Sequence, residues 1–311
     1  MYIFDNKVSI ENREKLQEYL LGYRYCTSGV SFSSLYMWRN INQFSWDIIG
    51  DYMVMSGVNY LDLEEGILHP FLGTPLTNNG KYDPDSLRKT ILIAKEKFEE
   101  KGYPFELKLI PFPLVEYFQK AFGRDIEITA DRDNFDYLYK KEDLIELKGK
   151  LLHKKKNHMN YFLKNYEYEY KKLDSSMSED AIDFIDRFNK KKDVPPHERE
   201  LLKLEEKAMK DVFENIDEAK YLAGAVYIDG KMEALSVGGI LNNNTVGTHI
   251  EKANIDYRGL YQIINMEFCK HMPQNIKYVN REEDMGLPGL RKSKLSYKPV
   301  KLVEKYNINF K

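Results

Sequence analysis

The chain has 311 residues, of which 42% are hydrophobic and 31% are charged, so it has enough apolar mass for folded cores and is not composed like a disordered chain. Its formal net charge of −2 excludes a surface that is basic throughout, and any contact with a polyanion must use a local patch. Its two cysteines, Cys26 and Cys269, are far apart and form no CxxC motif. Neither a disulfide framework nor a zinc site is therefore indicated.

Targeting segments are not recognised in the sequence. The N-terminus has no basic stretch leading into an apolar one, and no apolar run approaches the ~20 residues that cross a bilayer. We therefore expect a cytoplasmic protein without a membrane span.

The first half of the chain predicts a helix, a β-rich section and then a long helix between strands. The predicted elements are a helix at 10–21, strands at 44–49, 52–56, 60–63 and 67–71, a helix at 83–101, a strand at 105–110, a short helix at 114–122 and a strand at 126–129. Leu87, Ile91, Ala94 and Phe98 fall on one stripe of the long helix, which is the face expected to be buried.

The second half predicts the same order of elements. Strands are predicted at 221–228, 233–241 and 245–252, a helix at 259–271, a strand at 276–279, a short helical piece within 281–294 and a last strand at 298–306. This repetition favours two copies of one fold, and we place the boundary near residues 130–135. The expected class is α/β (α+β): two domains, 1–132 and 133–311, each a mixed, mostly antiparallel sheet flanked by helices.

The end of the third strand and the turn that follows it are the first candidate site. A glycine that opens a helix exposes backbone N–H groups that hold phosphate well, so Arg258, Gly259, Leu260 and Tyr261 predict a cofactor-binding turn. The alternative is that Gly259 only permits a tight turn.

The same strand carries a second candidate. Strict alternation puts His249 and Glu251 on one face, opposite Val246, Thr248 and Ile250. A histidine and a glutamate at a strand end suit a general base that takes a proton from an attacking amine. The alternative is a polar strand end that makes structural hydrogen bonds.

A charged loop follows the next predicted strand. Its three consecutive acids suit a cationic amino group, while its arginines suit a carboxylate or phosphate. The predicted substrate-binding residues are Asn280, Arg281, Glu282, Glu283, Asp284, Arg291 and Lys294. The alternative is a solvated loop, and nothing in the spacing demands a metal.

Residues 142–165 are predicted to be helical, with a basic helix at 148–165, ahead of a strand at 166–172 and helices at 178–191 and 199–213. Lys154, Lys155 and Lys156 suit an RNA backbone or the phosphates of a cofactor. The alternative is an amphipathic helix whose lysines face water, with four apolar residues facing the core: Leu147, Leu151, Met159 and Phe162.

These motifs resemble one known family. The segments that carry the resemblance are 149–158, 249–253, 259–261 with 265–268, and 280–286 followed by 289–297. They resemble soluble bacterial proteins similar to the C-terminal domain of phosphatidylglycerol lysyltransferases, and the resemblance covers nearly the whole chain. That family resembles tandem GNAT (N-acetyltransferase-like) proteins, which agrees with the repeat. The turn at Arg258 departs from the complete glycine-rich loop of acetyl-CoA users, because Tyr261 stands where a small residue is expected.

The resemblance implies a transferase that moves an aminoacyl group from charged tRNA, or an acyl group from acyl-CoA, onto an amine or hydroxyl acceptor. In this hypothesis Glu251 and His249 are catalytic, and the partners are tRNA and a small-molecule or peptide acceptor. The alternatives are a non-catalytic ligand- or RNA-binding protein on the same fold and a plain acyl-CoA N-acyltransferase. We expect a monomer, because two fused copies form a pseudo-dimer.

Overall fold

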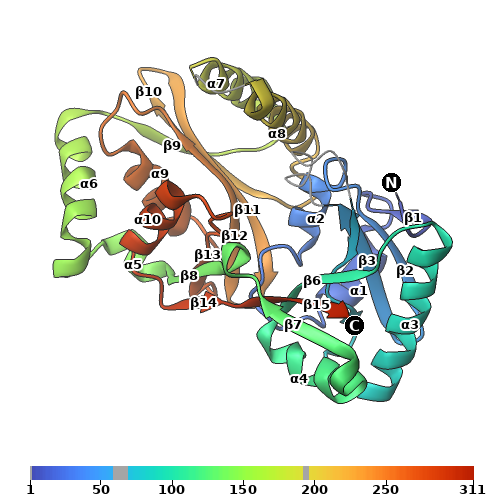
Figure 1. The fold of residues 1–311 in the computed structure, drawn as a ribbon. Coiled ribbons are helices and arrows are strands. Elements are labelled where there is room, and N and C mark those ends of the chain that lie inside the picture. The colour runs from blue at the N-terminus through green and yellow to red at the C-terminus, as the bar shows by residue number, and fades with distance from the viewer. Residues whose placement is uncertain (1, 59–68, 192–195) are drawn as a thin grey trace. The chain divides into compact units, whose positions relative to one another are not determined.

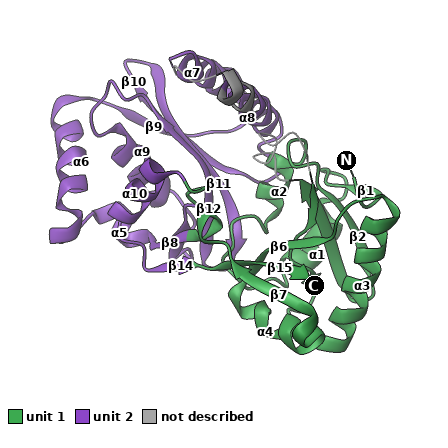
Figure 2. Cartoon of the chain, in the orientation of Figure 1, with its two compact units in different colours: residues 1–136, 283–286, 303–311 green, residues 137–282, 287–302 purple. Residues whose placement is uncertain are grey.

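The computed structural model describes residues 2–58, 69–191 and 196–311. Figure 1 labels its helices and strands. The chain divides into two compact units, which are coloured separately in Figure 2. Unit 1 comprises residues 1–136, 283–286 and 303–311, and unit 2 comprises residues 137–282 and 287–302.

Unit 1 contains four helices among its described residues: α1 (Arg13–Leu20), α2 (Phe32–Trp38), α3 (Pro84–Glu100) and α4 (Phe112–Phe122). Its strands are β1 (Asn6–Lys7), β2 (Ser45–Ile49), β3 (Tyr52–Val58), β4 (Pro70–Leu72), β5 (Leu76–Thr77), β6 (Glu106–Pro111), β7 (Ile126–Ala130) and β15 (Lys305–Phe310). They form one sheet in the order β1-β2-β3-β4-β6-β15-β7, with β5 beside β3.

Helix α3 supplies the centre of the unit 1 core. It begins after Asp83, whose side chain accepts a hydrogen bond from the backbone N–H of Ser86. The stripe Leu87, Ile91, Ala94 and Phe98 is fully buried, as the spacing predicts. Burying such a stripe against a sheet is the main source of stability for an amphipathic helix.

Unit 2 is built around a second sheet. Its helices are α5 (Lys141–Glu146), α6 (His153–Asn165), α7 (Ser178–Lys190), α8 (Pro196–Glu214), α9 (Leu260–Lys270) and α10 (Pro288–Ser296). Its strands are β8 (Asp136–Lys140), β9 (Glu169–Lys172), β10 (Leu222–Ile228), β11 (Lys231–Asn242), β12 (Thr245–Ala253), β13 (Tyr278–Asn280) and β14 (Lys301–Val303). The sheet order is β14-β8-β13-β12-β11-β10-β9.

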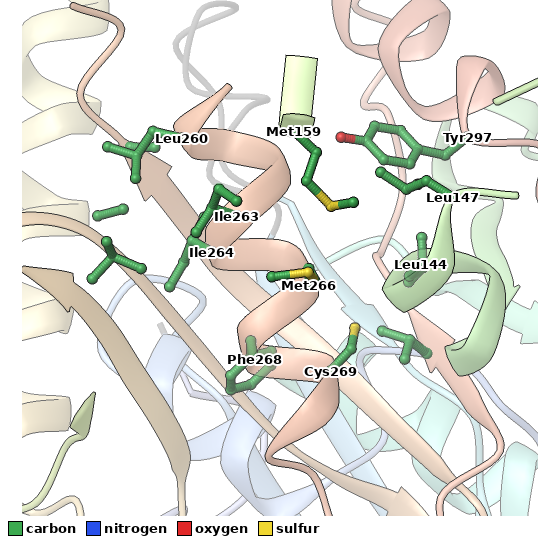
Figure 3. Packing of buried hydrophobic residues seen from close by; sticks show 14 of the residues in the cluster. Leu144, Leu147, Met159, Leu260, Ile263, Ile264, Met266, Phe268, Cys269 and Tyr297 are labelled. Atoms are coloured by element: carbon green, nitrogen blue, oxygen red, sulfur yellow. The ribbon is translucent and has the colours of Figure 1, made fainter. Parts of the chain in front are cut away.

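Helix α9 is the centre of the unit 2 core, and Figure 3 shows the apolar side chains packed around it. Its own Leu260, Ile263 and Ile264 are fully buried. Met159 of α6 and Tyr297, which directly follows α10, belong to the same cluster. This packing holds α9 beside strand β12.

The two sheets share one arrangement. In each, a helix connects two parallel strands: β4 and β6 around α3, and β12 and β13 around α9. Beside the second of these parallel strands, each sheet contains a strand from a distant part of the sequence: β15 lies between β6 and β7, and β8 lies between β13 and β14. In the sequence, β15 follows the strands of the second sheet and β8 follows the first seven strands of the first sheet.

The predicted elements differ from the structure at two places. The expected last strand at 298–306 is two strands, β14 and β15, and β15 pairs in the first sheet. The helix expected from 142 to 165 is broken where Leu147 and Gly149 have positive φ. The strand expected at 60–63 lies outside the described residues. The predicted domain boundary at 132/133 stays a prediction. In the division into two compact units, residues 283–286 and 303–311 belong to unit 1.

Candidate functional site

Strand β12 carries a β-bulge at His249. Val237 of β11 is opposite Ile250, whereas the next residue, Gly238, is opposite Thr248, so His249 is an extra residue on β12. The expected strict alternation along β12 is therefore wrong. Val246 and Ala253 pack in the core around α9, and Glu251 hydrogen-bonds to Asn265 of α9. Strict alternation would put Val246 and Glu251 on opposite faces of the strand, because they are an odd number of residues apart.

Beyond the bulge, β12 continues while its pairing with β13 stops at Gly247 and Asn280. The next side chain after β13 reaches back: Nη2 of Arg281 donates to Oε1 of Glu251 at 2.7 Å. The other oxygen of Glu251 accepts from Nδ2 of Asn265 on α9 at 2.9 Å. Both carboxylate oxygens are therefore held by donors from two separate elements.

Aromatic rings and a lysine surround this pair. The Arg281 guanidinium lies 4.8 Å from the ring centroid of Tyr297 and 5.8 Å from that of Tyr139. Nζ of Lys155, on α6, lies 4.3 Å from the centroid of Tyr297. Gln262 of α9 fixes Tyr297 by donating to its hydroxyl at 2.8 Å. We call the set Lys155, Glu251, Asn265, Arg281 and Tyr297 the Arg281 cluster.

The cluster shifts the pKa values of its two cations in opposite directions. Burial opposes the charge of Arg281, but the Glu251 carboxylate and Tyr297 raise its pKa above the ordinary value. For Lys155, burial and the neighbouring Arg281 charge lower the pKa, and Glu251 only partly compensates. Burial raises the pKa of Tyr297, so its hydroxyl stays protonated. Arg281 is thus always a cation here.

Two buried polar atoms of the cluster have no hydrogen-bond partner among the described residues. They are Nη1 of Arg281 and Oδ1 of Asn265, and the Asn265 side chain is only 1% exposed. Buried polar atoms are nearly always hydrogen-bonded, and leaving one unpaired costs about 1–3 kcal/mol. An unpaired donor and an unpaired acceptor beside one carboxylate are what a ligand site presents.

The predicted base His249 is held apart from this cluster by its own partner. Nδ1 of its buried ring lies at hydrogen-bond distance, 2.8 Å, from Oε1 of Glu282. The other two acids of the loop also have cations: Glu283 lies 3.4 Å from Lys305 and Asp284 lies 3.3 Å from Arg132. Each of the three predicted acids therefore has a cationic or ionisable partner within its own unit.

The remaining loop residues are dispersed. Buried Asn280 accepts from the backbone N–H of Glu282 at 2.7 Å, which shapes the turn. Nζ of Lys294 donates to the carbonyl of Arg281 at 2.6 Å and so supports the cluster from α10. Arg291 lies on α10, one helical turn before Lys294.

The predicted phosphate turn is filled by neighbouring protein. Gly259 has φ of +97°, and a Cβ there would lie 2.2 Å from the carbonyl oxygen of His158 on α6. Arg258 is exposed and stacks on the Tyr161 ring at 4.6 Å. Leu260 is buried in the core, and its N–H donates to the Tyr257 carbonyl at 3.1 Å. Gly259 thus permits a close approach of α6 to α9.

The three lysines of the basic helix have different surroundings. Lys154 is exposed, Lys156 donates to the carbonyl of Glu146 at 2.9 Å, and Lys155 joins the Arg281 cluster. The expectation that Leu151 faces the core is wrong. Its side chain is 73% exposed, because it lies in the short turn before α6 begins.

Sequence reasoning missed Asn265, Gln262, Tyr297 and Tyr139. Asn265 carried a usable signal, since it is a polar residue directly between Ile264 and Met266 on a helix that is otherwise apolar there. The others are ordinary in their local sequence, and only the fold gathers them.

Neither a cluster of metal ligands nor a membrane-spanning helix is found among the residues that the structure describes. The described part of the chain holds no group of three or more His, Cys, Asp or Glu side chains suited to a metal ion. Across residues 2–58, 69–191 and 196–311, none of the helices combines the length and the apolar composition needed to cross a bilayer.

The fold is that of tandem GNAT proteins. A tandem GNAT protein from the clavulanic acid biosynthesis pathway matches with a TM-score of 0.54 at 8% identity, covering 98% of this chain and 97% of its own. L-PGS of Bacillus licheniformis matches with a TM-score of 0.64 at 11% identity, covering 98% and 93%. Two mixed sheets flanked by helices, as predicted, are confirmed.

The family model described as phosphatidylglycerol lysyltransferase, C-terminal, matches residues 23–309, and the chain belongs to this family. A conserved protein of unknown function from Bacteroides thetaiotaomicron is 27% identical with a TM-score of 0.88, covering 100% of both chains. An uncharacterized protein of Mycoplasmoides gallisepticum is 29% identical over 185 residues, 58% of this chain. The match spans 58% of that curated relative's length.

Proposed function

We propose that this protein is a GNAT-type transferase that moves an aminoacyl group from charged tRNA, or an acyl group, onto an amine or hydroxyl acceptor. Family membership and the tandem GNAT fold support a transferase. The observation that carries the proposal is the Arg281 cluster, which gathers a carboxylate, two cations and unpaired polar atoms where β12 and β13 part.

Glu251 is our choice for the group that takes the proton. It belongs to the cluster that holds an unpaired donor and an unpaired acceptor, whereas the His249 ring is fully buried against Glu282. In the proposed step the acceptor nitrogen or oxygen attacks the donor carbonyl carbon, and a new C–N or C–O bond forms. Glu251 receives the acceptor's proton, and the bond to the tRNA ribose oxygen or the CoA sulfur breaks, with the proton passing to that leaving group.

Arg281 and His249 have supporting roles in this proposal. Arg281 donates from Nη2 to Oε1 of Glu251 at 2.7 Å and so orients this carboxylate. His249 is a positioning residue, because its bond to Glu282 fixes the loop that starts at Arg281.

The transfer assay uses the double variant Glu251→Gln with His249→Ala and each single variant. Removing Glu251 as a base should lower turnover by about 10²–10⁴-fold, while His249→Ala should act more weakly through the loop. Undiminished turnover in Glu251→Gln would refute the assignment of the base.

The donor is identified by comparing CoA, acyl-CoA, uncharged tRNA and charged tRNA in thermal unfolding. A ligand present at 100 times its Kd adds about 2.7 kcal/mol of apparent stability. A response to charged tRNA above uncharged tRNA supports the aminoacyl reaction, and a response to acyl-CoA alone supports the acyl-CoA N-acyltransferase.

A non-catalytic binding protein is the second candidate. It is favoured by the filled turn at Gly259, where α6 occupies the position at which a helix N-terminus would meet a phosphate. Ligand binding without turnover in any donor mixture would support this candidate.

The basic helix is proposed to contact RNA. Residues 148–165 contain six lysines and no acid. Replacing Lys154, Lys155 and Lys156 with Gln should weaken tRNA binding and reduce its dependence on salt. Equal affinity in the triple variant would show that the helix is a solvated face.

A further inference from the structure

We propose that the Arg281 cluster binds a carboxylate group of the substrate, so that the acceptor is an amino acid, a peptide or another small carboxylate. This inference rests on the proposed function for the identity of the acceptor, but the binding site itself is argued from the cluster alone.

Charge balance is the first argument. Arg281 and Lys155 bring two positive charges, and Glu251 brings one negative charge. Lys155 has no hydrogen bond or ion pair within the described residues, and its ammonium lies against the Tyr297 ring. One positive charge is therefore uncompensated in a half-buried place, where an isolated charge is costly. A monoanion restores neutrality, whereas a cation adds repulsion.

The hydrogen-bonding geometry is the second argument. Glu251 uses only Nη2 of Arg281, and the buried Nη1 is left without a partner. A guanidinium presents its donors in one plane, which suits a planar carboxylate. Tyr297 and Tyr139 lie on the guanidinium, at 4.8 and 5.8 Å from Arg281 to the ring centroids, and such rings favour a flat group over a tetrahedral one.

The supports of Arg281 are the third argument. Its carbonyl accepts from Nζ of Lys294 at 2.6 Å, and its N–H donates to the carbonyl of Tyr137 at 3.0 Å. With Glu251 on the guanidinium, both ends of the residue are fixed. Such preorganisation is what a binding residue needs, because little freedom is lost when the ligand arrives.

The acids of the neighbouring loop do not favour a cationic substrate instead. Glu282 lies 2.8 Å from the His249 ring, Glu283 lies 3.4 Å from Lys305 and Asp284 lies 3.3 Å from Arg132. Binding an ammonium group there would require breaking one of these pairs. The site thus selects a negative group.

The test is calorimetric titration of the full chain with N-acetylglycine, with its neutral amide N-acetylglycinamide, and with inorganic phosphate, at constant ionic strength. The carboxylate should bind saturably and at least about tenfold more tightly than the amide, since a charge-assisted hydrogen bond is lost. Absence of saturable carboxylate binding, or equal binding of the amide, overturns the proposal. Tighter binding of phosphate than of the carboxylate overturns the assignment to a carboxylate.

Matched variants locate the site. Lys155→Gln should weaken carboxylate binding about tenfold, whereas Lys154→Gln, the same charge change on the exposed neighbour, should leave this affinity within about twofold. Equal losses in both would show a diffuse effect of the basic helix and refute the site. Arg281→Lys keeps the charge but loses the planar donors, and it should weaken binding further. Carboxylate binding without any transfer would refute only the proposed function, and transfer without carboxylate binding would refute only this inference.

Discussion

Replacing Gly259 with alanine tests the packing of α6 against α9. Real Cβ contacts stay above 3.0 Å, and a Cβ at this position would lie 2.2 Å from the carbonyl oxygen of His158. The difference, 3.0 minus 2.2, means that the two backbones must separate by about 0.8 Å. The positive φ of +97° adds strain that glycine avoids.

The two costs can be estimated separately. A left-handed backbone costs a non-glycine residue roughly 1–2 kcal/mol, and forcing extra volume into a packed interior costs roughly 1–3 kcal/mol. We therefore expect Gly259→Ala to lower the free energy of unfolding of unit 2 by about 2–5 kcal/mol. Gly230→Ala is the matched control, because its φ is +75° and its Cβ would meet nothing within 4 Å. It should show the strain alone.

The assay is urea unfolding followed by labelling of Cys269, which is buried in α9, in a Cys26→Ser background. Trp38 and Trp46 both lie in unit 1, so their fluorescence follows that unit in the same samples. Equal shifts for Gly259→Ala and Gly230→Ala would show that the approach of α6 contributes nothing, and the turn would then be free to serve a ligand.

Two further sets of predictions concern buried ionisable groups. In unit 1, Lys305 is 3% exposed and donates to Asp136 at 2.6 Å, so Lys305→Met should destabilise unit 1 by about 3 kcal/mol in Trp fluorescence, and Lys305→Met combined with Asp136→Leu should recover part of the loss. Burial raises the pKa of Asp136 from 3.8 to about 6 against the opposing charge of Lys305. The folded state then keeps a proton that the unfolded state has lost, so stability should fall as pH rises from about 4 to about 6, and Asp136→Asn should remove this slope. Burial also raises the pKa of the Cys269 thiol to about 12, so labelling at pH 8 should be far slower in the folded protein than in urea. Rapid labelling of Cys269 in the folded state would contradict the packing of α9, and a flat profile between pH 4 and 6 would contradict the role of Asp136.

Local pattern predicts the elements whose period is set by one buried face. The stripe on α3 and the strands β10 to β12 were predicted to within a few residues. A helix with one buried face has an apolar residue at every third or fourth position, and a strand with one buried face has one at every second position, so both patterns can be recognised in the local sequence. The repeated element order likewise predicted two related sheets.

Features that depend on a partner strand were not predicted. The bulge at His249 exists only in the register between β11 and β12, so strict alternation put His249 and Glu251 on one face. The Arg281 cluster joins residues 155, 251, 265, 281 and 297, which come from five different parts of unit 2. Their meeting depends on the path of the whole sheet, and only Glu251, Arg281 and Lys155 were candidates beforehand.

The place of β15 in the first sheet has a consequence for synthesis of the protein. Strand β15 lies between β6 and β7, so the sheet of unit 1 lacks an interior strand until residues 305–310 have left the ribosome. The nascent chain must therefore hold β6 and β7 with unpaired edges while all of unit 2 is translated. Such edges invite pairing with other chains, so the unit that is translated first is the one whose folding finishes last.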